Sequence, residues 1–474
     1  MATSATTPGR TAISPHPGSS SRPWLALTLL CLAQLMLVLD ITVVNVALPA
    51  IGHGLRLGRA DLTWVLTAYT LAFGGLMLLG GRLADQFGAR QMLLTGLAVF
   101  TAASAVSGLA GSGAALIVGR VAQGVGAALL SPAALALVTT MFDGPRRARA
   151  LGIWAAVGGS GAAIGVAAGG LLTSEAGWRW VFFINLPVGL AVLAALPVLI
   201  AARPQPARRP LDLPGALIVV AATGAAIYGL ISAGSDGWLT AGALGPIAAA
   251  VAGYLLFGLR ERTAAAPLMQ VRLLATRSVG TGAFLMLVAT ALLVGGFFLG
   301  SFYLQQVRGY SAVHTGLAFL PLAVAIIVGA QAGGHLATAL DRRALTAGAL
   351  VLAAIGETVV ALWNGPVPMI TGLSVASIGI GAALVAASTT ALADTPPAEA
   401  GLRSGVINTF HELGSALGVA VLSSLAAPSL TGMRLTGFTR AFAACAVAAL
   451  AAALVALALA PAGRAAASAT PHGH

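Results

Sequence analysis

The sequence predicts an all-α membrane protein, and three observations lead to this fold class. Of the 474 residues, 58% are hydrophobic and only 8% are charged, whereas about a quarter of the residues of a soluble domain are charged. Apolar stretches of roughly 20 residues, enough to cross a hydrocarbon core, recur from Trp24 to Pro461. Backbone groups in lipid must be hydrogen-bonded internally, so we expect these stretches to be helices. The long alternating segments of a membrane barrel do not occur in the sequence.

Breaks made by glycine, proline and charged residues divide the chain into fourteen spans. We place the first six at 24–51, 63–81, 92–110, 114–138, 150–172 and 180–200. Two more follow at 213–232 and 242–259, and the last six lie at 280–303, 314–334, 344–362, 366–390, 404–425 and 437–460. Both cysteines, Cys31 and Cys445, fall inside spans, which argues against a stabilising disulfide.

An even number of spans places both termini on the same side, and the arginines indicate which side. With cytoplasmic termini, cytoplasmic segments hold 18 of the 25 arginines and external loops hold 6, as the positive-inside rule requires. Residues 1–23 are interpreted as a disordered cytoplasmic tail, and residues 461–474 as a second cytoplasmic tail. The net charge of +12 therefore reflects orientation in the membrane, and no nucleic-acid partner is expected. The Ala- and Gly-rich, lysine-free composition suggests a bacterial protein, which we place in the inner (cell) membrane.

An internal repeat divides the spans into two sets of six. Gly80–Ala84 and Gly333–Ala337 align at an offset of 253 residues. The same offset aligns three glycines of span five with three of span thirteen, namely Gly152, Gly161 and Gly165 with Gly405, Gly414 and Gly418. We therefore predict an N-terminal half at 24–200, an inserted helix pair with its flanking loops at 201–279, and a C-terminal half at 280–460. Paired halves with a site at their interface are typical of transporters.

Four motifs follow one another in the first half. They are Leu39–Pro49 in span one, Gly81–Arg90 after span two, Gly119–Gly126 in span four and the glycine-rich Gly152–Gly170 in span five. With these motifs the chain resembles the major facilitator superfamily, and within it the fourteen-span drug:proton antiporters, over about residues 24–460. The resemblance implies the major facilitator fold, with two six-helix halves plus two inserted helices.

Three charged residues inside spans are candidates for proton coupling. A carboxylate at membrane depth costs about 2.5–3.5 kcal/mol on insertion scales, so Asp40 needs a role, either binding a proton or cationic substrate or making a structural bond. Arg120 lies within two turns of Asp40 in depth, which allows contact between spans one and four. Glu412 in span thirteen is the second acidic candidate, and Asn408 shares its helical face. Glu357 in span eleven is given no role, and His411 is interpreted as structural.

The remaining candidates belong to the cavity, the gate and the helix packing. The predicted substrate cavity comprises Asp40, Asn45, Gln34, Gln123, Asn408 and Glu412. The resemblance implies a gating latch between spans two and eleven, built from Gly81, Arg82, Asp85, Gly88 and Arg90. The glycines spaced by three or four in span five allow close helix approach, and we expect them at the interface of the halves; they are Gly158, Gly161, Gly165 and Gly169.

The sequence offers no enzymatic chemistry and no bound cofactor. A nucleotide-binding loop is impossible without lysine, and metal-binding His or Cys spacings are missing. We therefore expect a proton-coupled exporter of small lipophilic compounds such as drugs or antibiotics, working by alternating access and driven by the proton gradient. The expected partners are the substrate, protons and membrane lipids, and we expect a monomer. Val166 stands where the antiporter pattern has proline, so an uptake symporter or a lipid flippase on the same fold stays an alternative.

Overall fold

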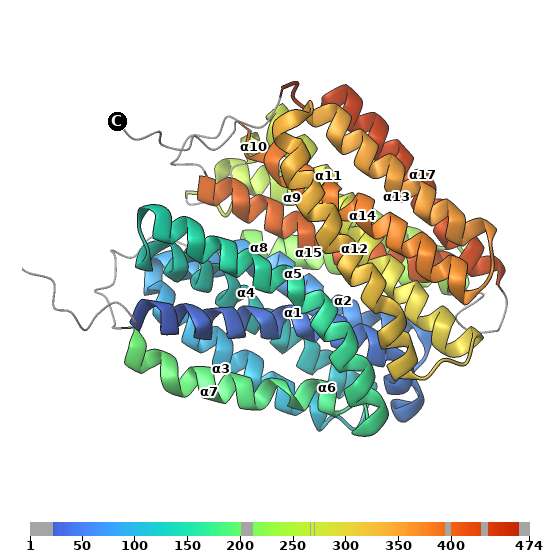
Figure 1. Ribbon diagram of the computed structural model, residues 1–474, viewed down its shortest axis with the longest axis horizontal. Helices are drawn as coiled ribbons and strands as arrows, with labels where there is room; N and C mark the ends of the chain where they lie inside the picture. Colours follow the sequence, from blue (N-terminus) through green and yellow to red (C-terminus); the bar gives the residue numbers. More distant parts are fainter. Residues whose placement is uncertain are drawn as a thin grey trace, which may run out of the picture.

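The computed structural model describes residues 22–200, 212–265, 267–269, 271–393, 400–427 and 435–463. All regular structure in these ranges is helical, and the long helices run side by side (Figure 1). Thirteen of the described stretches are long and apolar enough to cross a membrane, and the 32-residue helix α5 occupies the place of the predicted fifth span. The all-α membrane fold is therefore confirmed. Most of the predicted tails, at 1–21 and 464–474, lie outside the described residues.

The first half of the chain contains the six predicted spans in order. Its helices are α1 (Arg22–Leu55), α2 (Arg59–Phe87), α3 (Ala89–Gly108), α4 (Gly113–Met141), α5 (Gly144–Glu175), α6 (Trp180–Phe183) and α7 (Asn185–Leu199). Helices α6 and α7 together form the sixth span and are separated at Ile184. Pro187 explains this break, because it has no N–H to donate to the carbonyl of Phe183.

The inserted pair and the second half follow. The inserted helices are α8 (Leu213–Asp236) and α9 (Ala241–Thr263), followed by the short α10 (Val271–Ala275). The second half comprises α11 (Arg277–Phe302), a π-helical turn η1 (Tyr303–Val307), α12 (Ala312–Ala339), α13 (Arg342–Leu362), α14 (Pro366–Ala391), α15 (Ala400–Leu425) and α17 (Thr436–Leu459). Each predicted span thus has a helix or a broken helix in the structure.

The two halves pair their helices in the same order. Helix α1 packs on α5 and α7, and α4 packs on α2 and α3; likewise α11 packs on α15 and α17, and α14 packs on α12 and α13. The offset of 253 residues also relates individual contacts. Gly126 lies against the backbone of Gly96 and Phe100, and Gly379 lies against the backbone of Ala349 and Ala353. The sequence repeat therefore corresponds to a repeated three-dimensional unit.

The halves meet mainly through two helix pairs, α2 with α15 and α5 with α12. Many of these contacts lie at the end remote from the described chain ends. There, Thr63 of α2 and Ser423 of α15 share a hydrogen bond of 2.7 Å. At the same end, Gly170 of α5 lies against the backbone of Ala312 and Val313 in α12. This is the external end in the predicted topology, so in this conformation the halves are joined on that side.

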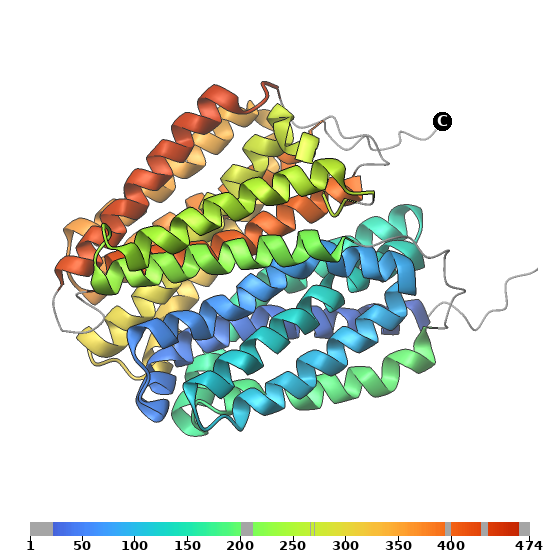
Figure 2. The same cartoon turned by 180° about the vertical axis from the view of Figure 1, so that it is seen from behind.

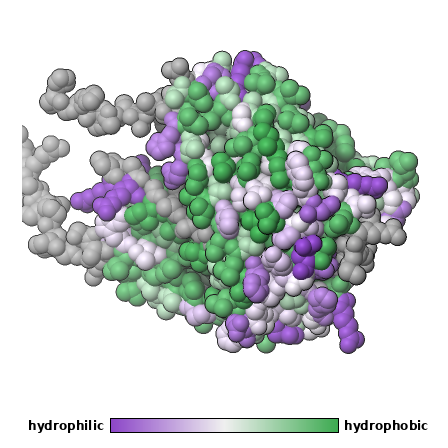
Figure 3. Space-filling model, turned by 45° about the vertical axis from the view of Figure 1, so that its right-hand side comes forward, coloured by the Kyte–Doolittle hydropathy of each residue, from purple (hydrophilic) through white to green (hydrophobic). Residues whose placement is uncertain are grey.

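The inserted pair covers one seam between the halves. Helix α8 contacts both α2 and α15, and α9 packs on α8. These two helices, green to yellow-green at the centre of Figure 2, lie across the boundary between the halves. Arg59 ties the three helices together, because it donates to Ile231 O of α8 at 2.8 Å and to Ser423 Oγ of α15 at 3.3 Å. Hydrophobic residues cover most of the middle of the molecular surface in Figure 3, and hydrophilic residues gather toward its margins.

Candidate functional site

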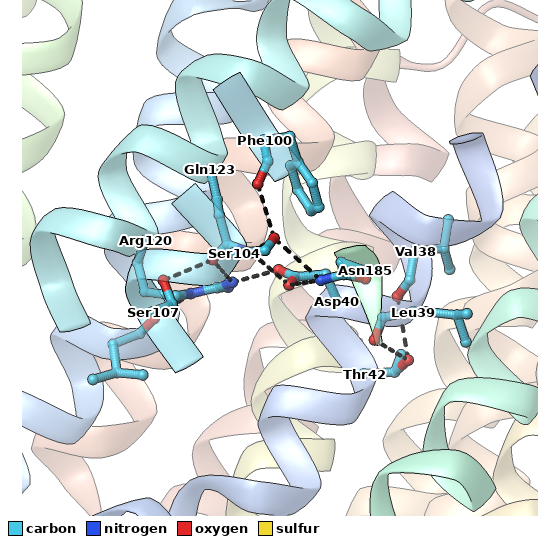
Figure 4. Close-up of polar contacts among 11 residues, drawn as sticks. Val38, Leu39, Asp40, Thr42, Phe100, Ser104, Ser107, Arg120, Gln123 and Asn185 are labelled. Carbon is cyan, nitrogen blue, oxygen red and sulfur yellow. Dashed lines mark hydrogen bonds and ion pairs between the residues drawn. The ribbon is translucent and has the colours of Figure 1, made fainter. Parts of the chain in front are cut away.

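The centre of the first half holds a fully buried ion pair between α1 and α4. Arg120 Nη1 donates a short hydrogen bond to Asp40 Oδ2, and both side chains are 0% exposed. Gln123 Nε2 donates to Asp40 Oδ1 at 2.9 Å, and Asn185 Nδ2 donates to the same oxygen at 3.1 Å (Figure 4). The expected approach of Asp40 and Arg120 is therefore present, and the carboxylate accepts three hydrogen bonds.

The guanidinium group of Arg120 also contacts α2. Its Nε donates to Val65 O at 2.9 Å, and its Cζ lies 4.4 Å from the centre of the Tyr69 ring. A cation over an aromatic face is attracted to the ring by about 0.5–2 kcal/mol. Arg120 therefore bridges α1 and α2, and any movement that separates it from Asp40 also changes its contact with α2.

Sequence reasoning missed three members of this cluster, Asn185, Ser104 and Tyr69. Ser104 Oγ accepts from Gln123 Nε2 at 2.8 Å and from Asn185 Nδ2 at 3.4 Å, and it donates to Phe100 O at 2.8 Å. The available signal was weak: each is a polar residue within an apolar span. Such residues often bond only to their own helix. The packing of α3 and α7 brings Ser104 and Asn185 into the cluster around Asp40.

This arrangement has a clear chemical consequence. Asp40 already accepts three hydrogen bonds from buried donors, so a proton or a cationic substrate that binds it competes with Arg120. Removing one partner of a buried ion pair leaves an uncompensated charge at a cost of about 3–5 kcal/mol. The site therefore favours two discrete states, one with the pair closed and one with the carboxylate neutralised by another partner.

The second acidic candidate lies at the contact between the halves. Glu412 of α15 is buried and packs against Gly74 of α2, where an added Cβ would lie 2.5 Å from Glu412 Cβ. Its Oε2 is without a hydrogen-bond partner in the described part of the chain. Asn408, one turn earlier, is exposed. His411 bonds through Nδ1 to Thr290 Oγ1 of α11 at 3.1 Å, a contact within one half that fits its structural interpretation.

The two predicted cavity residues of α1 lie on opposite sides of Asp40 along the helix. Gln34 is half-buried and Asn45 is buried, and the side-chain oxygen of each is unpaired among the described residues. The backbone carbonyl of Asn45 accepts a hydrogen bond from Ser301 Oγ of α11 at 3.2 Å. Asn45 thus contributes to the contact between the halves through its main chain.

The gating motif has partners other than the expected ones. Arg82 Nη2 donates to Pro267 O at 2.9 Å, in the segment after the inserted pair. Arg90 Nε donates to Ile200 O at 2.6 Å, beyond the end of α7. Asp85 is exposed and forms no hydrogen bond or ion pair with another described residue. The latch between spans two and eleven therefore stays a prediction.

The two glycines of the motif lie at different points of the connection from α2 to α3. Gly88 joins the two helices with a φ of +90°, a conformation that favours glycine. Gly81 faces α4, where an added Cβ would lie 3.9 Å from Pro132 Cβ. The motif thus shapes the turn between the helices.

The glycine-rich face of α5 differs from its expected position at the interface of the halves. An added Cβ at Gly161, Gly165 or Gly169 would meet α1 of the same half, at Val38, Thr42 and Val43 respectively. The repeat explains this, because Gly414 and Gly418 of α15 likewise lie against α11 of their own half. The contact with α12 comes from the neighbouring face of α5, through Gly170 and the carbonyl of Val166. The surroundings of Gly158 lie outside the described residues.

Comparison with known proteins agrees with the fold and adds the family. The sequence model of the Major Facilitator Superfamily matches residues 30–419, and the chain therefore belongs to this superfamily of membrane transporters. It is 39% identical over 436 residues to the puromycin resistance protein pur8 of Streptomyces alboniger, covering 90% of this chain and 84% of that protein. It is 38% identical over 429 residues to the tetracenomycin C resistance and export protein of Streptomyces glaucescens, covering 89% and 79%.

A solved structure supports the fold at the level of architecture. The inward-facing, unoccupied crystal structure of a bacterial homologue of the human lysosomal transporter Spinster superposes with a TM-score of 0.66 at 18% identity. The match covers 94% of this chain and 96% of that structure. The family match and the thirteen candidate spans together define the class of protein as a multi-span membrane transporter.

Proposed function

We propose that this chain is a proton-driven exporter of small lipophilic compounds such as antibiotics, in a bacterial cell membrane with both termini in the cytoplasm. The observation that carries the proposal is the closed pair of Asp40 and Arg120, buried at membrane depth with every carboxylate oxygen occupied. Two curated relatives that share at least 38% of the aligned residues are named for resistance to, or export of, antibiotics. The relatives support antibiotics as the class of transported compound, and the buried pair of Asp40 and Arg120 supports coupling of transport to protons.

The coupling begins with a proton reaching Asp40 from outside. Once protonated, Asp40 no longer neutralises Arg120, so the attraction between the two side chains falls. Arg120 then keeps its contacts to Val65 and Tyr69 of α2, and α2 packs on α15 of the other half. The protonation state of Asp40 in α1 is thereby coupled to the position of α2 and α15, a helix pair that joins the halves.

Glu412 extends this coupling across the interface. It packs directly on Gly74, a little over one turn beyond Tyr69 on α2. Because this carboxyl group lies so close to α2, the helix contacted by Arg120, it responds to movement of α2. We propose that Glu412 binds a second proton or the cationic group of a substrate. The substrate itself is bound mostly by apolar surface, which favours broad specificity.

The test uses the purified full-length chain in proteoliposomes with an acidic lumen and a pH-sensitive dye. Puromycin, tetracenomycin C and a panel of lipophilic cations are added to wild type, to Asp40→Asn and to Glu175→Gln. Glu175 is an exposed carboxyl at the end of α5 and serves as the matched control. We expect proton efflux on addition of a compound in wild type and Glu175→Gln, and none in Asp40→Asn.

Silence of the wild type across the panel would contradict the proposal and favour the lipid flippase or uptake symporter. Exchange of labelled for unlabelled compound checks whether Asp40→Asn is still folded. A variant that exchanges compound without moving protons has lost coupling alone, which is the expected behaviour. Unchanged proton efflux in Asp40→Asn would remove Asp40 from the mechanism.

A further inference from the structure

A second buried acid lies in the C-terminal half, away from the site described above. Glu357 of α13 is 0% exposed, and both of its carboxylate oxygens are unpaired among the described residues. An added Cβ at Gly296 of α11 would lie 3.9 Å from Glu357 Oε1, so the carboxyl group faces α11. Burial without a hydrogen-bond partner is unusual for any polar group and calls for a chemical reason.

The repeat identifies the place that Glu357 occupies. At the offset of 253 residues, Glu357 is the counterpart of Ser104, which belongs to the Asp40 cluster. Glu357 lines a small cavity of about 10 Å³, whose lining includes Leu293, Leu373 and Ala376. By the same offset these three residues are the counterparts of Asp40, Arg120 and Gln123. The cavity is thus the equivalent, in the second half, of the polar site in the first.

The chemistry of this equivalent site is different. Leucines replace the ion pair, so the lining contributed by α11, α12 and α14 carries no charged side chain, and Ser377 is its one hydroxyl group. Among described residues the titratable neighbour is Cys445 of α17, a buried thiol. An ionised carboxylate in such a pocket would have no counter-charge and at most one water molecule beside it, which is strongly unfavourable. The lining of this small cavity therefore offers the carboxyl group no partner that would stabilise a negative charge.

The position of α11 connects this acid to the contact between the halves. Gly296 precedes Ser301 by a little over one turn, and Ser301 is the residue that bonds to Asn45 of α1. Phe297, which also lines the cavity, packs edge-on against Phe319 of α12 with ring centres 5.1 Å apart. When α11 moves away from α1, the wall of the cavity that faces Glu357 moves with it.

We propose that Glu357 is a further proton-binding residue of the transport cycle, beside Asp40 and Glu412, loaded in the conformation described here and exposed to water when α11 moves. The proton is taken from water as the carboxyl O–H bond forms and is returned to water on the other side of the membrane when that bond breaks. The cavity volume is close to that of one water molecule, so one water can relay the proton. This inference rests on the proposed proton-coupled function and adds to it a site inside the second half, between α11, α13 and α14.

The experiment compares proton stoichiometry in proteoliposomes. The puromycin gradient that just balances an imposed pH gradient is measured for wild type, Glu357→Gln, Glu357→Leu and the exposed control Glu175→Gln. Both Glu357 variants are expected to exchange labelled for unlabelled puromycin and to move one proton fewer per puromycin than wild type and the control. The leucine variant matches the apolar lining of the cavity, so it tests the idea even if the glutamine variant does not fold.

Two outcomes separate the inference from the function on which it rests. If wild type moves no protons with any compound, the proposed function fails, and this inference fails with it. If wild type moves protons and both Glu357 variants keep its stoichiometry, the inference alone is overturned. Infrared spectra of the purified protein give an independent readout, because the carboxyl C=O band of a protonated acid should be present at neutral pH and reduced in both variants. An unchanged band would also overturn the inference.

Discussion

Ser301 of the second half donates a hydrogen bond to the backbone carbonyl of Asn45 in the first half, over 3.2 Å. In an uninterrupted helix that carbonyl would accept from the N–H four residues later, but this position is Pro49, which has no N–H. One turn further, Gln305 Nε2 in the π-helical segment donates to Val46 O at 2.9 Å. The proline in the first motif thus frees a main-chain acceptor that the other half occupies.

Removing this contact should loosen the external end. A typical intramolecular hydrogen bond contributes about 0.5–1.5 kcal/mol, so Ser301→Ala should raise the population with separated external ends by about 2- to 12-fold. Spin labels at the exposed positions His53 and Arg308, one in each half, would report the distance between the two external ends by double electron–electron resonance. Ser374→Ala is the control, because that hydroxyl bonds to Ile370 of its own helix. An unaltered distance distribution in Ser301→Ala would speak against the role of this bond.

The buried pair should respond unequally to loss of each partner. Asp40→Asn leaves Arg120 charged, because arginine does not give up its proton, whereas Arg120→Gln leaves a carboxyl group that can take one up. We therefore expect Asp40→Asn to lower the free energy of unfolding by about 3–5 kcal/mol and Arg120→Gln to lower it by less. The measurement is unfolding of the purified protein in mild detergent.

The double variant Asp40→Asn/Arg120→Gln gives the matched comparison. With no charge left in the pocket, it should recover most of the stability lost in Asp40→Asn while remaining inactive in proton exchange. A double variant that is the least stable of the three would mean that the pair contributes through packing and not through charge.

Close packing of α5 on α1 predicts a local clash at Gly165. A Cβ there would lie 1.8 Å from Thr42 Oγ1, so Gly165→Ala should lower the unfolding temperature, and adding Thr42→Ala should restore part of the loss. Gly334→Ala on α12, where nothing lies within 4 Å of the added Cβ, should instead raise stability by about 0.5–1 kcal/mol, the usual gain of alanine over glycine in a helix. Equal effects of the two alanines would refute the proposed packing.

Asp341, just before α13, should make its contact with Gly463, in the segment after α17, sensitive to acid. It accepts hydrogen bonds from the amides of Gly463 at 2.6 Å and Arg343 at 2.9 Å, and these bonds lower the pKa of its carboxyl group. A lowered pKa contributes stability that is present above the unfolded value near 3.9 and is lost as the pH falls through the folded value. Exchange of the Gly463 amide, corrected for its intrinsic rate, should therefore be slowed at neutral pH and accelerate in acid.

The variant Asp341→Asn provides the comparison for this exchange measurement. It should exchange the Gly463 amide faster than wild type at neutral pH and show little further change in acid. If the exchange rate of the Gly463 amide depended on neither pH nor this substitution, Asp341 would not be the group that protects this amide.

The membrane helices and their repeat could be predicted from the sequence because hydropathy and glycine spacing are local properties. Depth along two helices was likewise enough to expect Asp40 near Arg120. The donor Asn185 and the acceptor Ser104 could not be predicted as members of the Asp40 cluster, because only the packing of α3 and α7 brings them there. Similarly, helical spacing placed Gly161, Gly165 and Gly169 on one face but could not decide which neighbour that face meets. The partner of Arg82 depends on where the segment around Pro267 lies, which is a tertiary property.

The inserted pair gives the transporter two unlike flanks in the bilayer. On one flank, α8 and α9 shield the seam between α2 and α15 from acyl chains. On the opposite flank, the seam between α5 and α12 has no such cover among the described helices. Among the described helices, the bilayer therefore meets a seam between the halves directly on one flank and the inserted pair on the other, so the two sides of the molecule offer unlike surfaces to a compound dissolved in the lipid.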